Sequence, residues 1–260
     1  MKNLRKYGNV PYTIAVIHGG PGAPGEMAPV AQELSSAYGV LEPLQTKDSV
    51  DGQVQELMEV LRENARLPIT LIGFSWGAML SFIFTAQNPK FVEKLILIGS
   101  GVFQDKYAVS IMNTRLSRLN EEDRKTVLSI MNVLNNPEID DKNALFARFG
   151  KLIFKADSYN SIQEIDDVIE FQFHVFNGVW EDAERLRRTG ALLELGKLIK
   201  CPVVAIHGDF DPHPLEGVKE PLSEVLNDFR FILLENCGHR PWLEKEAKEG
   251  FYRILKKELL

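Results

Sequence analysis

Residues 73–77 read Gly-Phe-Ser-Trp-Gly, and the rest of the chain is organised around this pentapeptide. Residues 68–72 before it form a short apolar run with β-branched side chains, which predicts a buried strand. Residues 78–86 after it contain neither glycine nor proline and predict a buried helix. A serine at the apex of a sharp strand-to-helix turn, with a glycine two residues to either side, is typical of a nucleophile elbow. Such a turn strains the backbone of Ser75, and side chains at the glycine positions would collide across it.

Segments on both sides of this turn alternate between strand and helix patterns. Short apolar runs predict strands at residues 12–17, 40–44, 68–72, 92–98, 202–206 and 229–234. Apolar residues at helical spacing predict helices at residues 26–38, 54–62, 78–86, 216–227 and 241–259. This order predicts an α/β fold with a mostly parallel, doubly wound sheet that carries helices on both faces. The first dozen residues are polar or mixed.

Residues 103–198 interrupt the alternation. They predict helices and no strand, at residues 115–119, 121–134, 142–154, 161–176 and 182–195. Asn177-Gly178 is predicted to be a turn between two of these helices. The simplest interpretation is an inserted all-helical cap over the carboxyl edge of the sheet, where ligands bind in open α/β folds. The chain then divides into a core, residues 1–102 and 199–260, and a cap, residues 103–198.

The composition is that of an ordinary globular chain. Its 260 residues are enough for one large α/β domain with an insertion. A net charge of −6 offers no basic surface for nucleic acid or an anionic membrane, and no apolar run is long enough to span a bilayer. The polar start lacks the apolar core of a signal peptide, and two cysteines do not make a disulfide framework. We therefore expect a cytoplasmic protein without nucleic-acid or membrane partners; the sequence does not indicate its oligomeric state.

Three predicted strands are each followed by a residue suited to hydrolytic chemistry, in the chain order Ser75, Asp211 and His239. A serine hydroxyl is a weak nucleophile, so a neutral imidazole has to remove its proton as it attacks. That imidazole needs a carboxylate on its other nitrogen to fix its tautomer and to stabilise its charged form. The order Ser, Asp, His is similar to that of α/β-hydrolases. Ser75, Asp211 and His239 are therefore the predicted catalytic residues.

The tetrahedral intermediate of such a reaction carries an oxyanion that preorganised N–H groups have to bind. One predicted donor is the N–H of Trp76, which directly follows the serine. The other is the N–H of Gly20, in the loop His-Gly-Gly-Pro-Gly at residues 18–22 that follows strand 12–17. This loop lacks both the lysine of a phosphate-binding loop and the glycine spacing of a dinucleotide fingerprint, so no cofactor is predicted.

Asp209 competes with Asp211 for the role of the orienting acid. An aspartate directly after Gly208 could instead cap the turn, and the residues alone leave this choice open. His207 and His213 lie near the two aspartates in the sequence and form only a weak metal-binding pattern. Because the predicted triad already explains this region, no metal site is predicted.

These motifs together resemble one family. Residues 18–22 and 73–77 closely resemble the His-Gly-Gly-Pro-Gly turn and the Gly-x-Ser-Trp-Gly elbow of the proline iminopeptidase branch of the α/β-hydrolase superfamily. Residues 207–211 resemble its acid motif, which assigns the acid role to Asp211, and Gly238-His239 matches its catalytic histidine. The resemblance implies an α/β-hydrolase fold with an inserted helical cap and a reaction through an acyl-enzyme.

The resemblance also suggests substrate-binding residues. Cap glutamates of those peptidases bind the free α-amine of the substrate, and Trp180-Glu181 resembles a Trp-Glu pair that does so; the alternative for Glu181 is a solvated helix residue. His18 and Gly19 are predicted to contact the substrate from the loop. Fewer than twenty residues precede His18, so the usual N-terminal strand pair is expected to be missing or reduced. Residues 43–47 also lack the acidic-arginine-glycine stretch that is usual in the family.

Three hypotheses about function follow. The leading one is a serine hydrolase of small ester or amide substrates, including short peptides, with proline iminopeptidase-like specificity as its sharpest form. A carboxylesterase, a lactonase or a carbon–carbon bond hydrolase would use the same triad. A non-catalytic ligand-binding homologue is the third, because fold alone does not determine function. Such a homologue would be expected to lack a member of the triad, and all three members are present.

Overall fold

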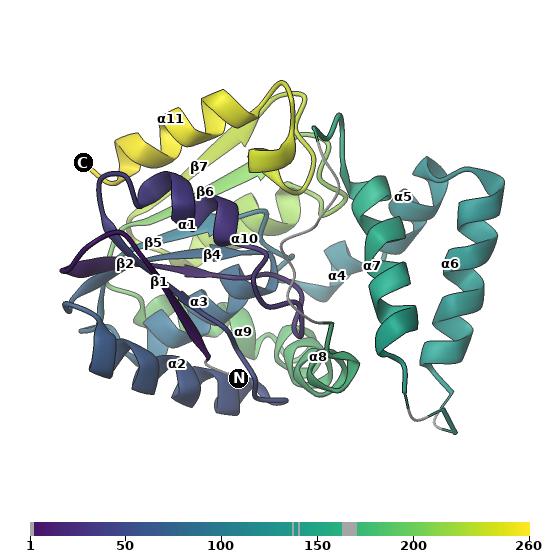
Figure 1. Ribbon diagram of the computed structural model, residues 1–260, viewed down its shortest axis with the longest axis horizontal. Helices are drawn as coiled ribbons and strands as arrows, with labels where there is room; N and C mark the ends of the chain where they lie inside the picture. The colour runs from purple at the N-terminus through teal and green to yellow at the C-terminus, as the bar shows by residue number, and fades with distance from the viewer. Residues whose placement is uncertain (1–2, 137, 140, 163–170) are drawn as a thin grey trace.

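The computed structural model describes residues 3–136, 138–139, 141–162 and 171–260. Within these residues a seven-stranded sheet has the order β1-β3-β2-β4-β5-β6-β7 (Figure 1). The strands are β1 (Leu4–Tyr7), β2 (Tyr12–Ile17), β3 (Gly39–Pro43), β4 (Ile69–Phe74), β5 (Val92–Ile98), β6 (Val203–Gly208) and β7 (Phe229–Leu234). All neighbouring pairs are parallel except β1 with β3. The predicted, mostly parallel sheet is confirmed.

The N-terminal strand, which the sequence led us to expect as missing or reduced, is present and short. β1 pairs antiparallel with β3 and forms one edge of the sheet. Its pattern misleads because it is an edge strand: its residues are half-buried or exposed, and charged side chains are common on sheet edges. The hydroxyl of Tyr7 donates a hydrogen bond to Glu42 of β3 at 2.7 Å, and Arg5 lies 3.6 Å from the same carboxylate. The N-terminal strands are therefore short but present.

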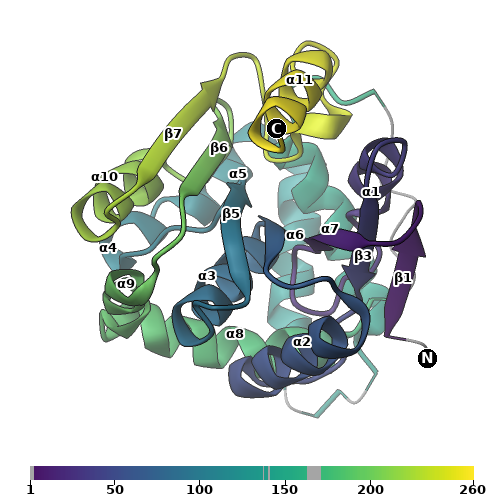
Figure 2. The ribbon, with the colours of Figure 1, turned by 90° about the vertical axis from the view of Figure 1, so that its left-hand side faces the viewer.

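Helices cover both faces of the sheet (Figure 2). They are α1 (Ala28–Leu34), α2 (Val50–Asn64), α3 (Trp76–Gln87), α4 (Asp105–Ala108), α5 (Ile111–Arg118), α6 (Glu121–Leu134), α7 (Asn143–Asp157), α8 (Phe173–Arg188), α9 (Ala191–Glu194), α10 (Glu216–Val225) and α11 (Lys248–Glu258), with 3₁₀ helices η1 (Leu195–Leu198) and η2 (Pro241–Leu243). Side chains alternate along β2: Ala15 and Ile17 pack with α2, α3, α8 and α10, whereas Ile14 and Val16 pack with α1 and α11. The sheet thus separates two hydrophobic cores.

The predicted cap, residues 103–198, is only partly separate from the core. Its described residues form helices and no strand, apart from an isolated bridge between Ser161 and Glu244. α5, α6 and α7 extend away from the sheet and have small hydrophobic clusters of their own (Figure 1). α8 instead buries Val175, Val179 and Ala183 in the core beside α2 and α3. α8 and α9 therefore belong to the layer that covers one face of the sheet.

The predicted turn at Asn177-Gly178 is also wrong, because both residues lie inside α8. The buried stripe at Val175, Val179 and Ala183 keeps helical spacing across them, and this packing overrides the turn preference of the dipeptide. A Cβ on Gly178 would lie 2.3 Å from the carbonyl oxygen of Asp48, so glycine lets α8 approach the loop before α2 closely. The predicted helix 161–176 lies partly outside the described residues, and α8 begins at Phe173.

None of the helices in the described part of the chain has both the length and the apolar character that crossing a bilayer requires.

Candidate active site

The turn between β4 and α3 has the geometry of a nucleophile elbow. Ser75 has φ 51° and ψ −115°, one of the rare positive φ values for a residue other than glycine. A Cβ on Gly73 would lie 2.2 Å from the carbonyl oxygen of Gly77, and a Cβ on Gly77 would lie 2.3 Å from that of Ile17. Both glycines are therefore required sterically, as the sequence predicted. The second contact also brings the elbow against the end of β2.

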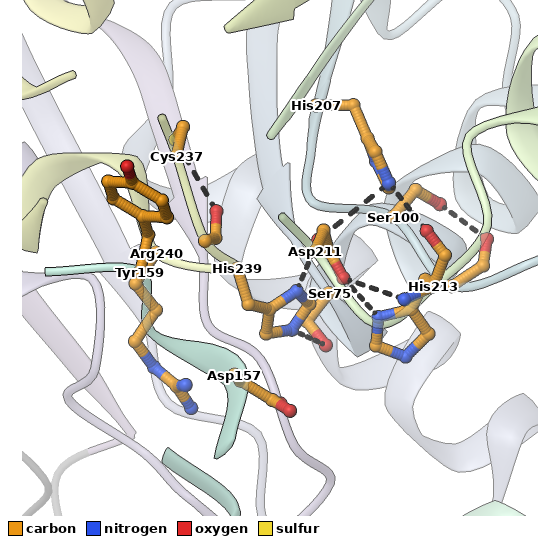
Figure 3. Close-up of polar contacts among 12 residues, drawn as sticks. Ser75, Ser100, Asp157, Tyr159, His207, Asp211, His213, Cys237, His239 and Arg240 are labelled. Atoms are coloured by element: carbon orange, nitrogen blue, oxygen red, sulfur yellow. Dashed lines mark hydrogen bonds and ion pairs between the residues drawn. The ribbon is translucent and has the colours of Figure 1, made fainter. Parts of the chain in front are cut away.

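The structure brings Ser75, Asp211 and His239 together from three strand ends (Figure 3). Ser75 follows β4, Asp211 lies in the loop after β6, and His239 lies in the loop after β7. The Nε2 atom of His239 is 3.0 Å from the hydroxyl oxygen of Ser75, and its Nδ1 atom is 2.6 Å from Oδ2 of Asp211. Nδ1–H therefore donates to the carboxylate, and Nε2 is placed to accept the serine proton.

Burial sets the charge state of this relay. Burial lowers the pKa of His239, and the neighbouring Asp211 carboxylate offsets only part of that effect. The imidazole is therefore neutral at physiological pH, which a general base requires. Burial alone would raise the pKa of Asp211, but the imidazoles of His239, His207 and His213 hold it well below its usual range. The carboxylate is thus ionised next to a neutral imidazole.

Asp209 and Asp211 have different surroundings. Asp209 is exposed, and its carboxylate accepts backbone N–H bonds from Asn236 and Cys237, both at 3.0 Å. These bonds tie the turn after β6 to the turn after β7. Asp211 is only 8% exposed and contacts His239 directly. The geometry favours Asp211 as the orienting acid and gives Asp209 the turn-capping role that the sequence left open.

The two predicted oxyanion donors, Gly20 and Trp76, follow the neighbouring strands β2 and β4. Trp76 is the first residue of α3, so its N–H has no acceptor within the helix. Its indole donates to Gln53 at 2.8 Å in the core, which fixes the start of α3. Gly20 follows β2 with φ 27°, and its carbonyl accepts from the N–H of Ala23 in a tight turn. The helix dipole of α3 adds positive potential at the serine.

The predicted contact of His18 with a substrate is not supported by its surroundings. The ring is 1% exposed, its Nδ1–H donates to the carbonyl of Gly19 at 2.9 Å, and its Nε2 accepts from the N–H of Gln45 at 3.1 Å. Burial lowers the pKa of His18, which keeps it neutral in these bonds. A Cβ on Gly19 would lie 2.7 Å from the ring of Phe74, so this glycine packs against the core. The His18 side chain therefore supports the loop.

Glu181 and Trp180 lie on α8, away from its buried stripe. Glu181 is exposed, about half a helical turn from both Val179 and Ala183, which face the core. Trp180 is half-buried and stacks on Phe176, with ring centroids 5.9 Å apart. The structure does not bring Glu181 into the group formed by Ser75, Asp211 and His239. This position matches the solvated helix residue that was the alternative interpretation of the Trp-Glu dipeptide.

Several residues that support the site were not predicted from the sequence. The N–H of His239 donates to the carbonyl of Asp157, at the end of α7, at 2.9 Å. The buried carboxylate of Glu244 accepts backbone N–H bonds from Gly238 at 3.2 Å and from Tyr159 at 3.0 Å. The helical extension is thus attached to the loop that carries His239. No local motif marks the contacts of His239 with Asp157 and of Glu244 with Tyr159, because they join segments more than 80 residues apart.

Two ion pairs flank the same loop. Asp157 is bound by the guanidinium of Arg115 through two bonds of 2.8 Å. Glu26 accepts from Nε of Arg240, the residue after His239, at 2.7 Å. Asp157 and Glu26 therefore each have a cationic partner, which offsets the cost of burying their charges.

Asp211, His213 and His239 also form a set of oxygen and nitrogen atoms within 4.8 Å of one another, which could in principle hold a metal ion. Each of these residues already makes short hydrogen bonds, including 2.6 Å from His239 and 2.7 Å from His213 to the same carboxylate. A metal bound between them would have to replace these bonds. The hydrogen bonds themselves account for the grouping.

The chain is similar to known proteins at the level of the fold. A model of the family described as alpha/beta hydrolase fold matches residues 47–246. A comparison with curated proteins gives no match. Among solved structures, VinJ aligns with a TM-score of 0.68 and 19% identity over 98% of this chain and 93% of its own. A putative lipase from Acinetobacter baumannii AYE has a TM-score of 0.65 and 20% identity over 98% and 87% of the two chains. A thermophilic esterase from Thermogutta terrifontis has a TM-score of 0.66 and 16% identity over 98% and 92%.

The family model covers 200 of the 260 residues and includes the elbow, the acid loop and His239. The chain belongs to the alpha/beta hydrolase family, which confirms the predicted fold class and the prediction of a hydrolase enzyme.

Proposed function

We propose that the protein is a serine hydrolase that cleaves carboxylic esters of small molecules through an acyl-enzyme. The observation that carries this proposal is the continuous relay from Ser75 through His239 to Asp211, with contacts of 3.0 and 2.6 Å. The strained elbow adds a second argument, because backbone strain of this kind persists where a function requires it.

In the proposed reaction, His239 Nε2 takes the proton of Ser75 while the serine oxygen attacks the carbonyl carbon of the ester. The N–H groups of Trp76 and Gly20 bind the oxyanion that forms. His239 then returns the proton to the leaving alkoxide, and an acyl-enzyme remains. Water, deprotonated by the same nitrogen, attacks the acyl group and releases the acid and the free serine. The sequence consumes only water, so it needs no cofactor.

Proline iminopeptidase-like specificity is the finer alternative, and the motifs at residues 18–22 and 73–77 are its support. Such a specificity requires a carboxylate that is free to bind the ammonium group of the substrate. Asp157 pairs with Arg115 through both of its oxygens, Glu26 pairs with Arg240 through Oε1, and Glu244 accepts backbone N–H groups. Glu181 faces solvent. We therefore favour uncharged esters as substrates over peptides with a free amine.

A panel of substrates tests this choice. We expect kcat/KM for short acyl esters to exceed that for free-amine prolyl and alanyl amides by at least about tenfold, which is 1.4 kcal/mol in transition-state stabilisation. We expect Glu181→Gln to change neither value, because its exposed side chain does not contact the relay. A preference for free-amine amides that Glu181→Gln weakens through a higher KM would instead establish the peptidase alternative. Lactones belong in the same panel, since the triad would open them too.

The pH dependence of the reaction follows from the burial of His239. Because the pKa of His239 is lowered by burial, the imidazole stays neutral to below its ordinary value near 6.5. Activity is then fully present above the lowered pKa and is lost as the pH falls through it, when the base becomes protonated. We expect the acid limb of kcat/KM, measured with an ester whose leaving group does not titrate, to have an apparent pKa below 6.5. A limb centred clearly above 6.5 would contradict this assignment of the base.

A further inference from the structure

The carboxylate of Asp211 accepts hydrogen bonds from two imidazoles, those of His239 and His213, and Nε2 of His207 lies 3.8 Å from its Oδ2 atom (Figure 3). Its Oδ2 atom accepts from Nδ1 of His239 at 2.6 Å. Its Oδ1 atom accepts from Nδ1 of His213 at 2.7 Å, and also from the backbone N–H of His213 at 2.9 Å. Both oxygens are thus held, and a carboxylate held at both oxygens cannot rotate about its Cβ–Cγ bond without breaking a charge-assisted hydrogen bond.

His213 is itself held in place. Its residue is 8% exposed, and its ring lies against that of His239, with centroids 4.8 Å apart and planes inclined by 35°. Nε2 of His207 donates to the carbonyl of His213 at 2.9 Å, which anchors the loop from β6. Within the described chain, the bond to Asp211 is the one hydrogen bond that the His213 side chain makes. Removing the imidazole therefore removes a single polar interaction.

We propose that His213 is a positioning residue of the hydrolytic site, which orients the carboxylate of Asp211 toward His239 and limits the basicity of His239 by sharing that carboxylate. The inference rests on the proposed function for its catalytic part, because Asp211 matters to the rate only if His239 is the base. Its geometric part depends only on the contacts among the three side chains.

The hydrogen bond from His213 to Asp211 lowers the pKa of His239. A donor on Oδ1 stabilises the negative charge of Asp211, so less of that charge is available to stabilise a protonated His239. A proton on His213 itself would repel one on His239 across 4.8 Å. Both effects lower the pKa of His239, and the contribution of His213 acts in this sense. Other charged or titratable groups in the described chain that act on the His239 and Asp211 pair include His207, Asp157, Arg115, Arg118 and Cys237.

The test compares three variants of His213 in the full chain. His213→Phe keeps a ring of similar size and removes the donor. His213→Asn places an amide N–H close to the position of Nδ1 and should rescue the contact, whereas His213→Gln carries its amide one bond further out and should not. His174, which is exposed on α8, supplies the matched control His174→Phe.

We expect His213→Phe to lower kcat for an ester about tenfold with little change in KM, and to move the acid limb of kcat/KM up by about half a pH unit or more. His213→Asn should restore both values toward wild type. In an Asp211→Asn background, His213→Phe should cost nothing further, because its effect passes through Asp211. His174→Phe should behave as wild type.

A measurement without turnover separates this inference from the proposed function. NMR titration of the His239 ring protons should show a higher pKa in His213→Phe than in wild type, whether or not the protein cleaves esters. If the pKa of His239 is the same in both, the inference is wrong even in an active enzyme. If the pKa rises but no ester is cleaved and Ser75 is inert, the proposed function fails and the contact among the three side chains stands. Should His213→Phe not fold, His213→Gln is used for the same comparison.

Discussion

Ser75→Ala is expected to abolish labelling by a fluorophosphonate probe and to lower kcat for an ester by about 10⁴-fold or more. The probe phosphonylates a serine only when a base removes its proton, and His239 Nε2 lies 3.0 Å from the Ser75 hydroxyl. His239→Ala removes that base and should cost a similar factor. The double variant should be no worse than either single one, because the two residues act as a unit.

Ser100 supplies the control for this prediction. It follows β5, the strand next to β4, but its hydroxyl donates to the carbonyl of Gly101 at 3.0 Å instead of contacting an imidazole. Ser100→Ala should therefore still be labelled by the probe at the wild-type rate. Equal labelling of wild type and Ser75→Ala, measured by intact-protein mass spectrometry, would show that Ser75 is not the nucleophile.

The site residues could be predicted from the sequence because each follows a buried strand within a short local motif. Parallel strands end at the same edge of a sheet, so residues that follow β4, β6 and β7 meet there without further information. The glycines of the elbow add a steric requirement that is visible in the letters alone. Local pattern and chain order were sufficient to place Ser75, Asp211 and His239 at one edge of the sheet.

Elements whose structure depends on distant partners could not be predicted in this way. β1 is a strand because β3 pairs with it, although its own residues are mostly polar. α8 runs through Asn177-Gly178 because its apolar stripe packs on the core and Gly178 fits against the loop before α2. The exposure of Glu181 could not be predicted for the same reason, since a dipeptide does not show which face of a helix is buried.

His213 lies between these two cases. It stands two residues after Asp211 in the sequence, and from the sequence alone it forms only part of a weak metal-binding pattern. Its contact with the carboxylate requires the loop after β6 to turn back, so that the ring and backbone N–H of His213 reach the same oxygen. A histidine at this spacing from the acid is a signal that could be sought in other sequences with this loop.

The second large effect is expected at Asp211. Asp211→Asn should lower kcat by about 10⁴-fold, because an amide next to His239 Nδ1 allows the wrong tautomer and no longer stabilises the imidazolium. Asp209→Asn should leave kcat within a few fold, since its carboxylate is bound to the N–H groups of Asn236 and Cys237 and not to an imidazole. The loss of one of these capping bonds should lower the free energy of unfolding by about 1 kcal/mol.

Measuring kcat and Tm for both variants separates catalysis from stability. A low kcat at unchanged Tm for Asp211→Asn, beside a reduced Tm at nearly full kcat for Asp209→Asn, is the expected pattern. The reverse pattern would assign the acid to Asp209, and His239 would then have to leave a contact of 2.6 Å for a carboxylate that is exposed. That rearrangement would break the bond of His239 to Asp211 and leave Oδ2 of the buried carboxylate without this partner, so the structure opposes it. We therefore expect Asp209 to hold the turn and Asp211 to orient the base.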